Sequence, residues 1–420
     1  MTVGVVGAGM SGLATTHYLS KQGVDVRTFE ADSEPGGVVD SRTIDGHVLE
    51  RGPQRLRRSA PVDELIEEFD LEDEVRVGHD DQPLYGYYDG ALRPMPLSVR
   101  DAITTDLLSW RGKARILFEP LTGPVRDGET VAEFLTRKFG PEASRRFMGP
   151  LYSGLYGTEA DDMYVKYSLG KALAHVGIDD QSILRYVLRR LIEGIDTPPI
   201  ITFEDGLQTV ANAIYDAHHD SIDLSTPVTG VESVGDRYRI ETENDEVTVD
   251  SIVLTTPAPT TASLLAAIDE RSAEAVGEFN YNPIGVVHLE SAYDRDGHGF
   301  HVIDEGFETN GSTWNHSMLD REGIYTSYIG SGNPQFLDAD PAVVGQRAAD
   351  EFERITGAEA DVLDVTVVRP GMPAYDRSWT ALDDVSLPDD VAICSAFTAR
   401  AGVVGRIRDG KRIAAEMAGH

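Results

Sequence analysis

The first thirty residues constrain the fold most, because they read as a strand, a glycine-rich turn and a helix in that order. The valine-rich residues 3–6 predict a short buried strand. Gly7, Gly9 and Gly12 follow in the G-x-G-x-x-G spacing. Gly7 permits the tight turn, Gly9 lets the backbone approach a pyrophosphate, and Gly12 lets the helix pack closely on the strand. The free N–H groups at the start of this helix attract an anion.

An acidic residue after the second predicted strand supports a bound dinucleotide. The helix ends at Gly23, which suits a left-handed cap, and residues 24–29 read as a strand. Glu30 follows it, eighteen residues beyond Gly12, where a carboxylate accepts hydrogen bonds from an adenosine ribose. The alternative is a glycine-rich turn that holds no ligand. The strand, the helix and the acid together favour dinucleotide binding.

The stretch after Glu30 separates two kinds of dinucleotide-binding protein. A nicotinamide-binding unit continues here into a helix, whereas this chain continues into a loop, ADSEPGGVVD at 31–40. A predicted hairpin follows over residues 41–49, around the turn Asp45-Gly46. A loop of this kind covers the middle of a longer ligand and is typical of flavin dinucleotide binding. A nicotinamide-only dehydrogenase is therefore the weaker interpretation.

The charge balance of the chain indicates the salt concentration in which the protein works rather than its mechanism. Acidic residues number 71 against 37 lysines and arginines, which gives a formal net charge of −34 and a pI near 4.5. Acids spread along the whole chain, with few lysines, are typical of a protein adapted to high salt, because dense salt screens self-repulsion. A basic partner surface would instead predict a clustered acidic patch. A surface this negative repels phosphates, so no nucleic-acid partner is expected.

Cysteine and histidine usage excludes several kinds of site. Cys394 is the only cysteine, which excludes disulfides within the chain, iron–sulfur clusters and cysteine zinc sites. His298, His301 and His316 have no carboxylate companion at ligand spacing, so we expect no metal site. The first strand leaves no room for a signal peptide, and no apolar run approaches the roughly eighteen residues of a membrane span. These features predict a cytoplasmic protein.

The middle of the chain, from residue 98 to about residue 190, has helical apolar spacing and predicts a helical insert. Apolar stripes of this kind most often face a protein core. An alternative is peripheral contact with a membrane surface through Leu107, Leu108, Trp110, Ile116, Leu117 and Phe118. The acidic charge of the chain argues against anionic lipid as the docking partner.

The rest of the chain contains further predicted elements. Apolar runs predict strands at 222–228 and at 391–397, and a strand at 252–254 that leads into the motif TTP at 255–257. Residues 407–417 predict the last helix.

Five motifs follow one another along the chain. They are GAGMSG at 7–12, Glu30, the glycine pair at 36–37 with RGP at 51–53, DGLQT at 205–209 with STPV at 225–228, and AGVV at 401–404 before the last helix. This order resembles the flavin amine oxidase superfamily, in particular the protoporphyrinogen oxidases. The resemblance extends over nearly the whole chain. Three further segments favour the porphyrinogen branch: FEDGLQTVANAI at 203–214, GPLYSGLYGTEADDMYVKYSL at 149–169 and PAYDRSW at 373–379.

The resemblance implies the fold class and the domain layout. The expected fold is α/β, with a Rossmann-type, glutathione-reductase-like FAD-binding domain, a mixed antiparallel-sheet substrate domain and a helical insert. The FAD-binding domain is expected in three segments, 1–83, 199–260 and 388–420. The helical insert, as part of the substrate domain, is expected at 84–198, and the sheet of the substrate domain at 261–387.

The resemblance also implies roles for single residues. The pyrophosphate of FAD would be cradled by Gly7, Ala8, Gly9, Met10, Ser11 and Gly12. The adenosine would meet Glu30, Ala31 and the backbone of Val228. The flavin side would be lined by Val38, Gly52, Pro53, Gln54 and Arg55, with Ala401, Gly402 and Val403 against the isoalloxazine ring. The cofactor-binding set is completed by Gly36, Gly37 and Thr256, and the substrate would face Leu151, Gly154 and Leu155.

Several positions depart from the family pattern. Arg400 stands where the family has a glycine before the flavin contact, and near the ring it would stabilise an anionic reduced flavin. Val38 replaces a basic or large residue after the glycine pair. A basic anchor for a propionate is missing near residue 84, and Arg93 is the nearest candidate, with an exposed surface arginine as the alternative.

The expected chemistry is that of a flavin enzyme. The sequence shows no serine–histidine–acid set and no paired carboxylates in one motif, which fits an enzyme whose cofactor carries the reaction. We expect hydride transfer from a C–H bond of a small-molecule substrate to FAD. The alternatives are an amine oxidase or a carotenoid desaturase of the same superfamily, and a non-catalytic binding protein on this fold. The sequence does not indicate an oligomeric state.

Overall fold

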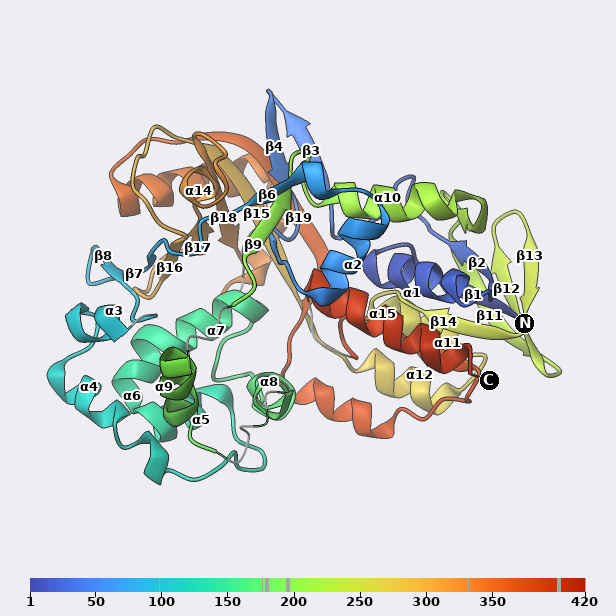
Figure 1. The fold of residues 1–420 in the computed structure, drawn as a ribbon, viewed down its shortest axis with the longest axis horizontal. Helices are drawn as coiled ribbons and strands as arrows, with labels where there is room; N and C mark the ends of the chain where they lie inside the picture. The colour runs from blue at the N-terminus through green and yellow to red at the C-terminus, as the bar shows by residue number, and fades with distance from the viewer. Residues whose placement is uncertain are drawn as a thin grey trace. The chain divides into compact units, whose positions relative to one another are not determined.

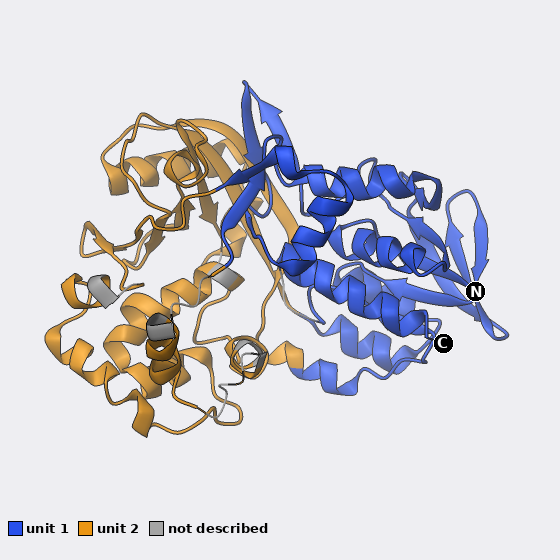
Figure 2. Cartoon of the chain, in the orientation of Figure 1, with its two compact units in different colours: residues 1–77, 198–279, 380–420 blue, residues 78–197, 280–379 orange. Residues whose placement is uncertain are grey.

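The computed structural model of the chain describes residues 1–97, 99–175, 177, 181–193, 197–330, 332–398 and 402–419. The chain forms two compact units (Figure 2). The first unit comprises residues 1–77, 198–279 and 380–420, and the second comprises residues 78–197 and 280–379. Each unit is therefore assembled from segments that lie far apart in the sequence.

The first unit is built on a five-stranded parallel sheet of the order β10–β2–β1–β14–β20. Short runs rich in valine and isoleucine suit such strands, because a parallel sheet is covered on both faces. This sheet confirms the Rossmann-type α/β fold predicted for the first strands. Its members are β1 (Thr2–Val6), β2 (Asp25–Phe29), β10 (Ile222–Asp223), β14 (Ser251–Leu254) and β20 (Val391–Ile393).

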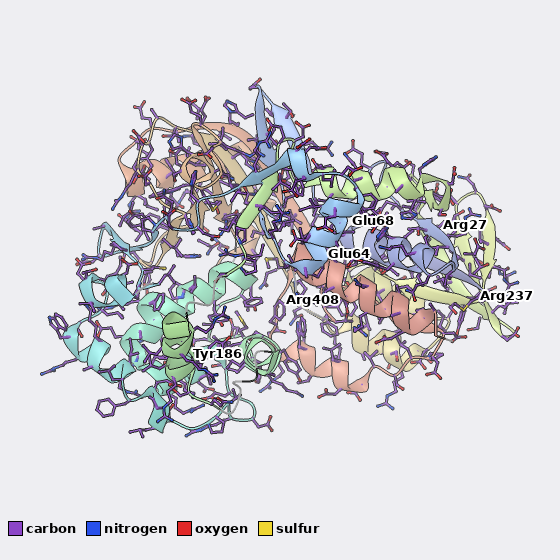
Figure 3. All side chains as sticks on the ribbon, viewed as in Figure 1. Arg27, Glu64, Glu68, Tyr186, Arg237 and Arg408 are labelled. Carbon is purple, nitrogen blue, oxygen red and sulfur yellow. The ribbon has the colours of Figure 1, made fainter. Side chains whose placement is uncertain are left out.

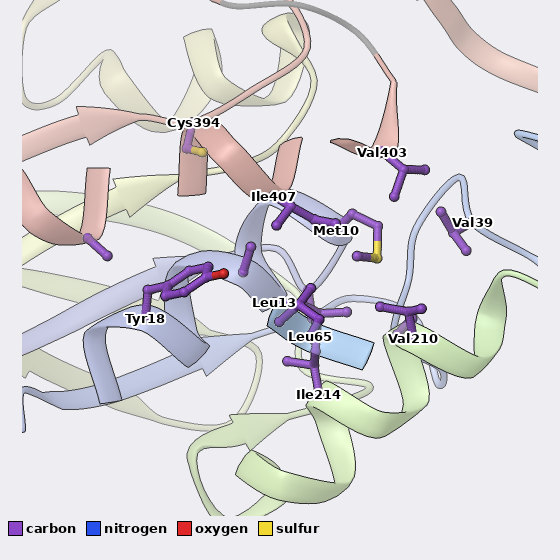
Figure 4. Packing of buried hydrophobic residues seen from close by; sticks show 14 of the residues in the cluster. Met10, Leu13, Tyr18, Val39, Leu65, Val210, Ile214, Cys394, Val403 and Ile407 are labelled. Carbon is purple, nitrogen blue, oxygen red and sulfur yellow. The ribbon is translucent and has the colours of Figure 1, made fainter. Parts of the chain in front are cut away.

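Four helices of the first unit share one hydrophobic core. They are α1 (Met10–Lys21), α2 (Ala60–Glu68), α10 (Gln208–His218) and α15 (Val403–Met417). Figure 4 shows Leu13 of α1 among Leu65 of α2, Ile214 of α10 and Ile407 of α15. Helices α1 and α15 lie side by side (Figure 1), and a Cβ atom added at Gly410 would come within 2.8 Å of the Ala14 Cβ. The absent side chain lets the two helices approach closely.

Smaller elements complete the first unit. A hairpin is formed by β3 (Ser41–Ile44) and β4 (His47–Glu50). One three-stranded sheet contains β5 (Leu56–Arg57), β9 (Ile200–Phe203) and β6 (Val75–Val77) in this order. A second contains β11 (Val228–Val234), β12 (Arg237–Thr242) and β13 (Glu246–Val249). The helical elements are α11 (Ala258–Leu265), α12 (Glu270–Gly277) and the short turns η1 (Glu72–Glu74) and η4 (His219–Ser221). The hairpin lies where the sequence predicted it.

The second unit contains a seven-stranded sheet of the order β19–β15–β18–β17–β16–β7–β8, antiparallel except for the β16–β7 pair. This is the mixed, mainly antiparallel sheet that we expected. One face packs on α14 (Pro341–Thr356), where Phe352 meets Phe300 and Tyr325. The strands are β7 (Leu84–Tyr88), β8 (Ala91–Pro94), β15 (Tyr281–Glu290), β16 (Gly299–Val302), β17 (Thr309–Thr313), β18 (Ile324–Ile329) and β19 (Asp361–Pro373).

Helices form the rest of the second unit, and they begin at α3, later than the predicted start of the insert at residue 84, because β7 and β8 join the sheet. A buried ion pair holds part of this insert together. Its elements are α3 (Val99–Thr104), α4 (Trp110–Ile116), η2 (Glu119–Leu121), α5 (Val131–Phe139), α6 (Pro141–Ala143), η3 (Ser144–Met148), α7 (Gly149–Tyr156), α8 (Leu169–His175) and α9 (Ile183–Glu193). The buried Glu119 carboxylate lies 2.9 Å from Nζ of Lys138 and accepts hydrogen bonds from the Ser182 hydroxyl and the Ile183 N–H. It therefore joins η2, α5 and α9.

Two short elements lie between strands of the sheet along the chain, α13 (Asn315–Leu319) and η5 (Pro334–Asp338). A third, η6 (Arg377–Asp384), follows β19 and continues into the first unit. Within the described part of the chain, no helix combines the length and the apolar character that a membrane span needs.

Two predicted strands are shorter than the sequence indicates. The strand predicted at 222–228 breaks into β10 and the start of β11, because Ser225 takes a left-handed φ of +52° and its N–H donates to the Asp32 carbonyl at 2.9 Å. The strand predicted at 391–397 ends at Ile393. A turn follows it, in which the Thr398 N–H donates to the Ser395 carbonyl. Apolar composition alone did not reveal either turn.

The predicted sheet segment 261–387 is also too long at both ends. Residues 261–279 lie in the first unit, in α11 and α12, where Leu265 and Val276 are buried. Residues 380–387 belong to the first unit as well, and the Ser386 N–H donates to the Ser272 hydroxyl of α12 at 3.0 Å. Helical spacing in residues 258–277 is the signal that the sequence analysis missed.

A buried histidine pair joins three helices of the first unit. His17 on α1 is 1% exposed, and its Nδ1 lies 3.1 Å from Nε2 of His218 on α10. Its Nε2 lies 3.4 Å from Oε2 of Glu68 on α2, which Figure 3 labels. Burial lowers the pKa of His17 to about 4, although the Glu68 carboxylate alone would raise it. Burial lowers the pKa of His218 too.

We predict that this histidine pair makes the first unit sensitive to acid. As the pH falls from 6.5 to about 4, the unfolded chain protonates His17 while the folded chain does not, so the free energy of unfolding decreases through this window. The effect is on the order of 3 kcal/mol for His17. The free energy of unfolding, measured by urea at constant salt, should therefore change less with pH for His17→Phe than for the wild type.

The matched control for this prediction is His219→Phe, because His219 is an exposed histidine of the same unit. The control should keep the pH dependence of the wild type. Equal pH dependence in His17→Phe and the wild type would contradict the role given to burial.

Candidate functional site

The carboxyl ends of three neighbouring strands bring the predicted dinucleotide residues together. Gly7 follows β1, Glu30 follows β2, and Thr255 and Thr256 follow β14. These strands are adjacent in the order β2–β1–β14. In an open parallel sheet, ligands bind at this edge, because the loops that leave the strands surround a crevice there.

The turn after β1 leaves no room for side chains. Gly7 has a φ of +104°, in the left-handed region that favours glycine. A Cβ atom at Gly12 would lie 1.8 Å from the Gly7 carbonyl oxygen, so α1 meets this turn backbone to backbone. No side chain caps α1 at Gly9. The first N–H groups of the helix can therefore bind an anion.

The loop at 31–40 folds back onto this turn. The Gly36 N–H donates to the Ala8 carbonyl at 2.9 Å, and Gly9 and Gly36 form an isolated parallel bridge. A Cβ atom at Gly37 would lie 3.2 Å from the Gly9 Cα. Two glycine segments thus face each other with no side chain between them. We call residues 7–12 with Gly36 and Gly37 the glycine cradle.

Glu30 lies beside the glycine cradle and bonds to its backbone. Oε2 of Glu30 accepts a hydrogen bond from the Ala8 N–H at 2.5 Å, and Oε1 accepts one from the Asp32 N–H at 3.0 Å. A carboxylate oxygen can accept more than one hydrogen bond. The Glu30 carboxylate therefore supports the glycine turn and still offers lone pairs to ribose hydroxyls.

The flavin side is predicted at the segment around Val38 and Gly52. The Val38 side chain is 60% exposed, and a Cβ atom at Gly52 would lie only 1.7 Å from the Val38 carbonyl oxygen. Gln54 is buried, and its Nε2 donates to the carbonyls of Glu50 at 2.7 Å and Gly52 at 3.1 Å. Gln54 thus holds the backbone that carries Gly52, a supporting role that the sequence did not predict.

The start of α15 reaches the same region of the first unit. Gly402, with a φ of +97°, precedes the helix, and Val403 is buried as its first residue. Figure 4 shows Val403 near Met10 of α1 and Val39 of the loop, all members of one buried cluster. Helix α15 begins before the predicted start at Ile407. The predicted contacts Arg400–Ala401 lie outside the described residues.

The other predicted cofactor contacts have the following positions in the first unit. Ala31 is exposed directly after Glu30, and Pro53, Arg55 and Val228 are half-buried. The Thr256 hydroxyl pairs with the Thr261 hydroxyl at 2.8 Å, while the Thr256 carbonyl accepts a hydrogen bond from the Ser395 hydroxyl. Their contact with a cofactor stays a prediction.

Three residues that support the site were missed by the sequence analysis. The Thr255 hydroxyl donates to the carbonyls of Val6 at 2.8 Å and Gly7 at 3.1 Å, which fixes the glycine turn. Nε2 of Gln208 donates to the Pro35 carbonyl at 2.7 Å, which fixes the loop before the glycine pair. Both residues stood inside the quoted motifs TTP and DGLQT, which was the available signal.

The third residue is Glu50, which is 2% exposed at the end of β4. Its Oε2 accepts a hydrogen bond from the Ser41 hydroxyl at 2.6 Å, and its Oε1 accepts one from the Leu207 N–H at 2.8 Å. The Glu50 carboxylate therefore ties the hairpin to the start of α10. Its place directly before RGP was the only hint in the sequence.

The predicted substrate residues belong to the second unit and lie on α7. Leu151 is half-buried against a small cluster that contains Met95 and Phe147. Gly154 faces β16, where a Cβ atom would collide with the imidazole of His301. The Leu155 side chain lies outside the described residues.

The other basic and histidine candidates have local partners. Nε of Arg93 donates to the Tyr88 carbonyl at 3.0 Å, and its guanidinium also pairs with Asp106, so Arg93 ties β8 to the insert. Nε2 of His298 lies 2.8 Å from the His79 carbonyl, and His316 accepts the Gly323 N–H at 3.0 Å. The described residues contain no group of three or more potential metal ligands.

Comparison with known proteins identifies the family. A model of the flavin containing amine oxidoreductases matches residues 10–417. The chain belongs to this family. It is 26% identical to the chloroplastic protoporphyrinogen oxidase 1 of Spinacia oleracea, over 84% of this chain and 70% of the relative. It is 23% identical to the coproporphyrinogen III oxidase of Bacillus subtilis, over 88% of this chain and 87% of the relative.

Solved structures share the fold. A protein from Exiguobacterium sp., assigned as a protoporphyrinogen oxidase, superposes with a TM-score of 0.80 at 19% identity over 99% of this chain and 98% of its own. A putrescine oxidase superposes with a TM-score of 0.73 at 16% identity, with 100% of both chains covered. This family member is an FAD-dependent oxidoreductase that acts on a small molecule.

The first unit fits a flavin dinucleotide. The glycine cradle presents backbone without side chains, α1 begins without a side-chain cap, and a carboxylate stands at the end of β2. These are the groups that a pyrophosphate and an adenosine ribose require. The residues present and the family assignment therefore agree.

Gly52→Ala should weaken FAD binding, because the new Cβ atom would overlap the Val38 carbonyl oxygen and displace the predicted flavin side. Overpacking of this kind costs roughly 1–3 kcal/mol, which corresponds to a loss of about tenfold to hundredfold in FAD affinity. The measurement is titration of the apoprotein with FAD, followed by flavin fluorescence.

Gly277→Ala is the matched control. It lies in α12 of the same unit, and its Cβ atom would meet only the Ala262 Cβ at 3.8 Å, an ordinary contact. The control should bind FAD as the wild type does. Unchanged FAD affinity in Gly52→Ala would show that the Val38 segment does not contribute to the cofactor site.

Proposed function

We propose that this FAD-dependent enzyme oxidises a porphyrinogen, a reduced cyclic tetrapyrrole. The observation that carries the proposal is the pair of relatives, a protoporphyrinogen oxidase and a coproporphyrinogen III oxidase, whose alignments cover 84% and 88% of this chain. Bound FAD supplies a two-electron acceptor for hydride from a substrate C–H bond. The chain itself must bind the tetrapyrrole, orient it and receive the protons that its N–H groups release.

We propose the following division of labour. The first unit holds FAD through the glycine cradle and Glu30, with further contacts from Ala31, Val38, Gly52, Pro53, Gln54, Arg55, Val228, Thr256, Ala401, Gly402 and Val403. The second unit holds the substrate, with Leu151, Gly154 and Leu155 of α7 facing it. Support comes from the bare backbone of the cradle and from the position of Gly154 next to a histidine.

The second candidate is an amine oxidase. It is favoured by the family model, which describes flavin containing amine oxidoreductases, and solved structures of a putrescine oxidase and a cyclohexylamine oxidase share the fold. These two structures are 16% and 15% identical to the chain, so they support the fold rather than the substrate.

A substrate comparison tests the proposal. The FAD-loaded protein in concentrated salt is mixed with protoporphyrinogen IX, coproporphyrinogen III or putrescine. We expect porphyrin fluorescence to grow with at least one porphyrinogen at a rate well above its spontaneous oxidation. Turnover of the amine without oxidation of either porphyrinogen would contradict the proposal and favour the second candidate.

We also infer that the protein works in concentrated salt. Its formal net charge of −34 produces strong repulsion between the acidic side chains. Salt shortens the distance over which charges repel each other, to about 10 Å at 0.1 M and about 3 Å at 1 M. We predict that the melting temperature rises steadily as KCl increases from 0.1 M to 2 M. A melting temperature that is independent of salt would contradict this inference. The cytoplasmic location stays a prediction from the sequence.

We further propose that the helical insert contacts an anionic lipid surface. Leu107 and Leu108 are buried and do not contribute, but Trp110, Leu117 and Leu121 are 76%, 69% and 81% exposed. The segment 110–121 carries three bases, Arg111, Lys113 and Arg115, and its one acid, Glu119, is buried and paired. The acidic charge of the whole chain argues against anionic lipid, but this segment is locally basic, and the local charge favours anionic lipid at this surface.

Sedimentation with vesicles tests this contact. The wild type should sediment with phosphatidylglycerol vesicles more than with phosphatidylcholine vesicles, and Leu121→Ser should reduce the bound fraction several-fold. Val343→Ser is the matched control, because Val343 is 52% exposed on α14, outside this segment. Equal binding by Leu121→Ser and the wild type, or no binding at all, would contradict the proposal.

A further inference from the structure

One row of residues crosses the sheet of the second unit. The strand register aligns Gly86 of β7 with His301 of β16, His301 with Gly311 of β17, and Gly311 with Tyr328 of β18. The row continues to Val286 of β15. Residues aligned in this way across neighbouring strands point to the same face of the sheet. His301 and Tyr328 are therefore the two polar side chains of a row that otherwise contains Gly86, Gly311 and Val286.

This row lies on the face of the sheet that α14 does not cover. Phe300, next to His301 in β16, and Tyr325, three residues before Tyr328 in β18, pack in the core with Phe352 of α14. Because side chains alternate along a strand, His301 and Tyr328 point to the opposite face. Both side chains are half-buried, so part of their surface stays accessible.

Glycines surround the His301 ring. A Cβ atom at Gly154 of α7 would lie 2.1 Å from Cε1 of His301, and one at Gly311 would lie 3.4 Å from its Nδ1. The imidazole therefore occupies space that a side chain at position 154 would fill. Gly154 is also one of the residues that we propose to face the substrate, so the His301 ring belongs to the same wall.

Helix α7 is attached to the sheet on both sides of β17 and β18. At one attachment Gly154 meets His301 of β16. At the other, Nδ2 of Asn282 in β15 donates to the Gly157 carbonyl at 2.8 Å. Strands β18 and β17 lie between β15 and β16 in the sheet order. Gly311 thus lies on a strand between the two attachment points of α7, with His301 on one neighbouring strand and Tyr328 on the other.

The spacing of this pair suits a flat ring that carries N–H groups. His301 and Tyr328 are two strands apart, which corresponds to roughly 9.5 Å between their Cα atoms. The Tyr328 hydroxyl is already placed by the Thr313 hydroxyl, 3.3 Å away. Imidazole nitrogen and phenol oxygen both accept hydrogen bonds from N–H donors.

We propose that His301 accepts the proton that a pyrrole N–H loses during substrate oxidation, and that Tyr328 holds the ring in place across Gly311. The role rests on the proposed porphyrinogen substrate. In each two-electron step a bridging carbon gives up hydride to FAD, a pyrrole nitrogen gives up a proton, and a double bond forms between them along the conjugated path. The His301 imidazole takes that proton and later releases it to water.

Other ionisable groups lie on the elements packed against His301. Strand β17 carries none, and Asp304 after β16 accepts hydrogen bonds from the N–H groups of Asp89 and Gly90. The remaining groups are Tyr85, Tyr87 and Tyr88 of β7, of which Tyr88 stacks on the Arg146 guanidinium, and Tyr152 and Tyr156 of α7. Among these named groups His301 supplies the one imidazole, the side chain most often used for general-base catalysis.

The test compares the FAD-loaded wild type with His301→Gln, Tyr328→Phe and Gly154→Ala. For the wild type, kcat/KM with coproporphyrinogen III should fall at acid pH, because protonated imidazole cannot accept a proton. His301→Gln should lose this acid limb and about 10²- to 10⁴-fold in kcat/KM. Gly154→Ala should displace the ring and reproduce this result, and Tyr328→Phe should mainly weaken binding of the porphyrin product, measured by fluorescence quenching.

His219→Gln is the matched control, since His219 is an exposed histidine of the first unit. It should keep the rate and the pH profile of the wild type, and all variants should show the same flavin absorbance. A His301→Gln variant that keeps its acid limb and its rate would overturn the role of His301 while leaving the substrate proposal intact. A wild type that binds FAD but oxidises neither porphyrinogen would overturn both.

Discussion

The first unit depends on one close approach of backbone to backbone. At Gly12 the helix α1 lies so near the Gly7 carbonyl that a Cβ atom would be 1.8 Å from its oxygen. This contact places the start of α1 at the carboxyl edge of the sheet, where the helix dipole can bind an anion.

The surrounding elements hold that arrangement. The Thr255 hydroxyl fixes the glycine turn, and the bridge between Gly9 and Gly36 holds the loop against it. Gly410 lets α15 pack closely on α1, which brings Val403 beside Met10. Each of these contacts needs a small residue or a hydroxyl at one position, and none has space for a larger side chain.

The sequence was sufficient to predict the start of the first unit, residues 1–49, because the signals there are local. The glycine spacing at 7–12, the acid at Glu30 and the hairpin at 41–49 each describe a short segment whose backbone chemistry allows few alternatives. One of the errors has a long-range cause. The turn at Ser225 depends on a hydrogen bond to Asp32, which lies almost two hundred residues earlier, so the sequence around Ser225 could not indicate it.

The second unit was harder to predict, because its site depends on strand register. His301, Gly311 and Tyr328 are far apart in the sequence and become neighbours only when β16, β17 and β18 pair. The sequence analysis considered His301 only as a metal ligand. Its environment of glycines on α7 and β17 cannot be read from residue spacing, since it arises from packing between a helix and a sheet.

The central claim is that FAD held by this chain takes electrons from a porphyrinogen. The most direct measurement is rapid mixing of the FAD-loaded protein with coproporphyrinogen III or protoporphyrinogen IX in concentrated salt without oxygen, followed by visible absorbance. The account predicts that the absorbance of oxidised flavin disappears in a concentration-dependent phase as porphyrin absorbance appears. Flavin that stays oxidised with both porphyrinogens, but is reduced by an amine, would contradict it.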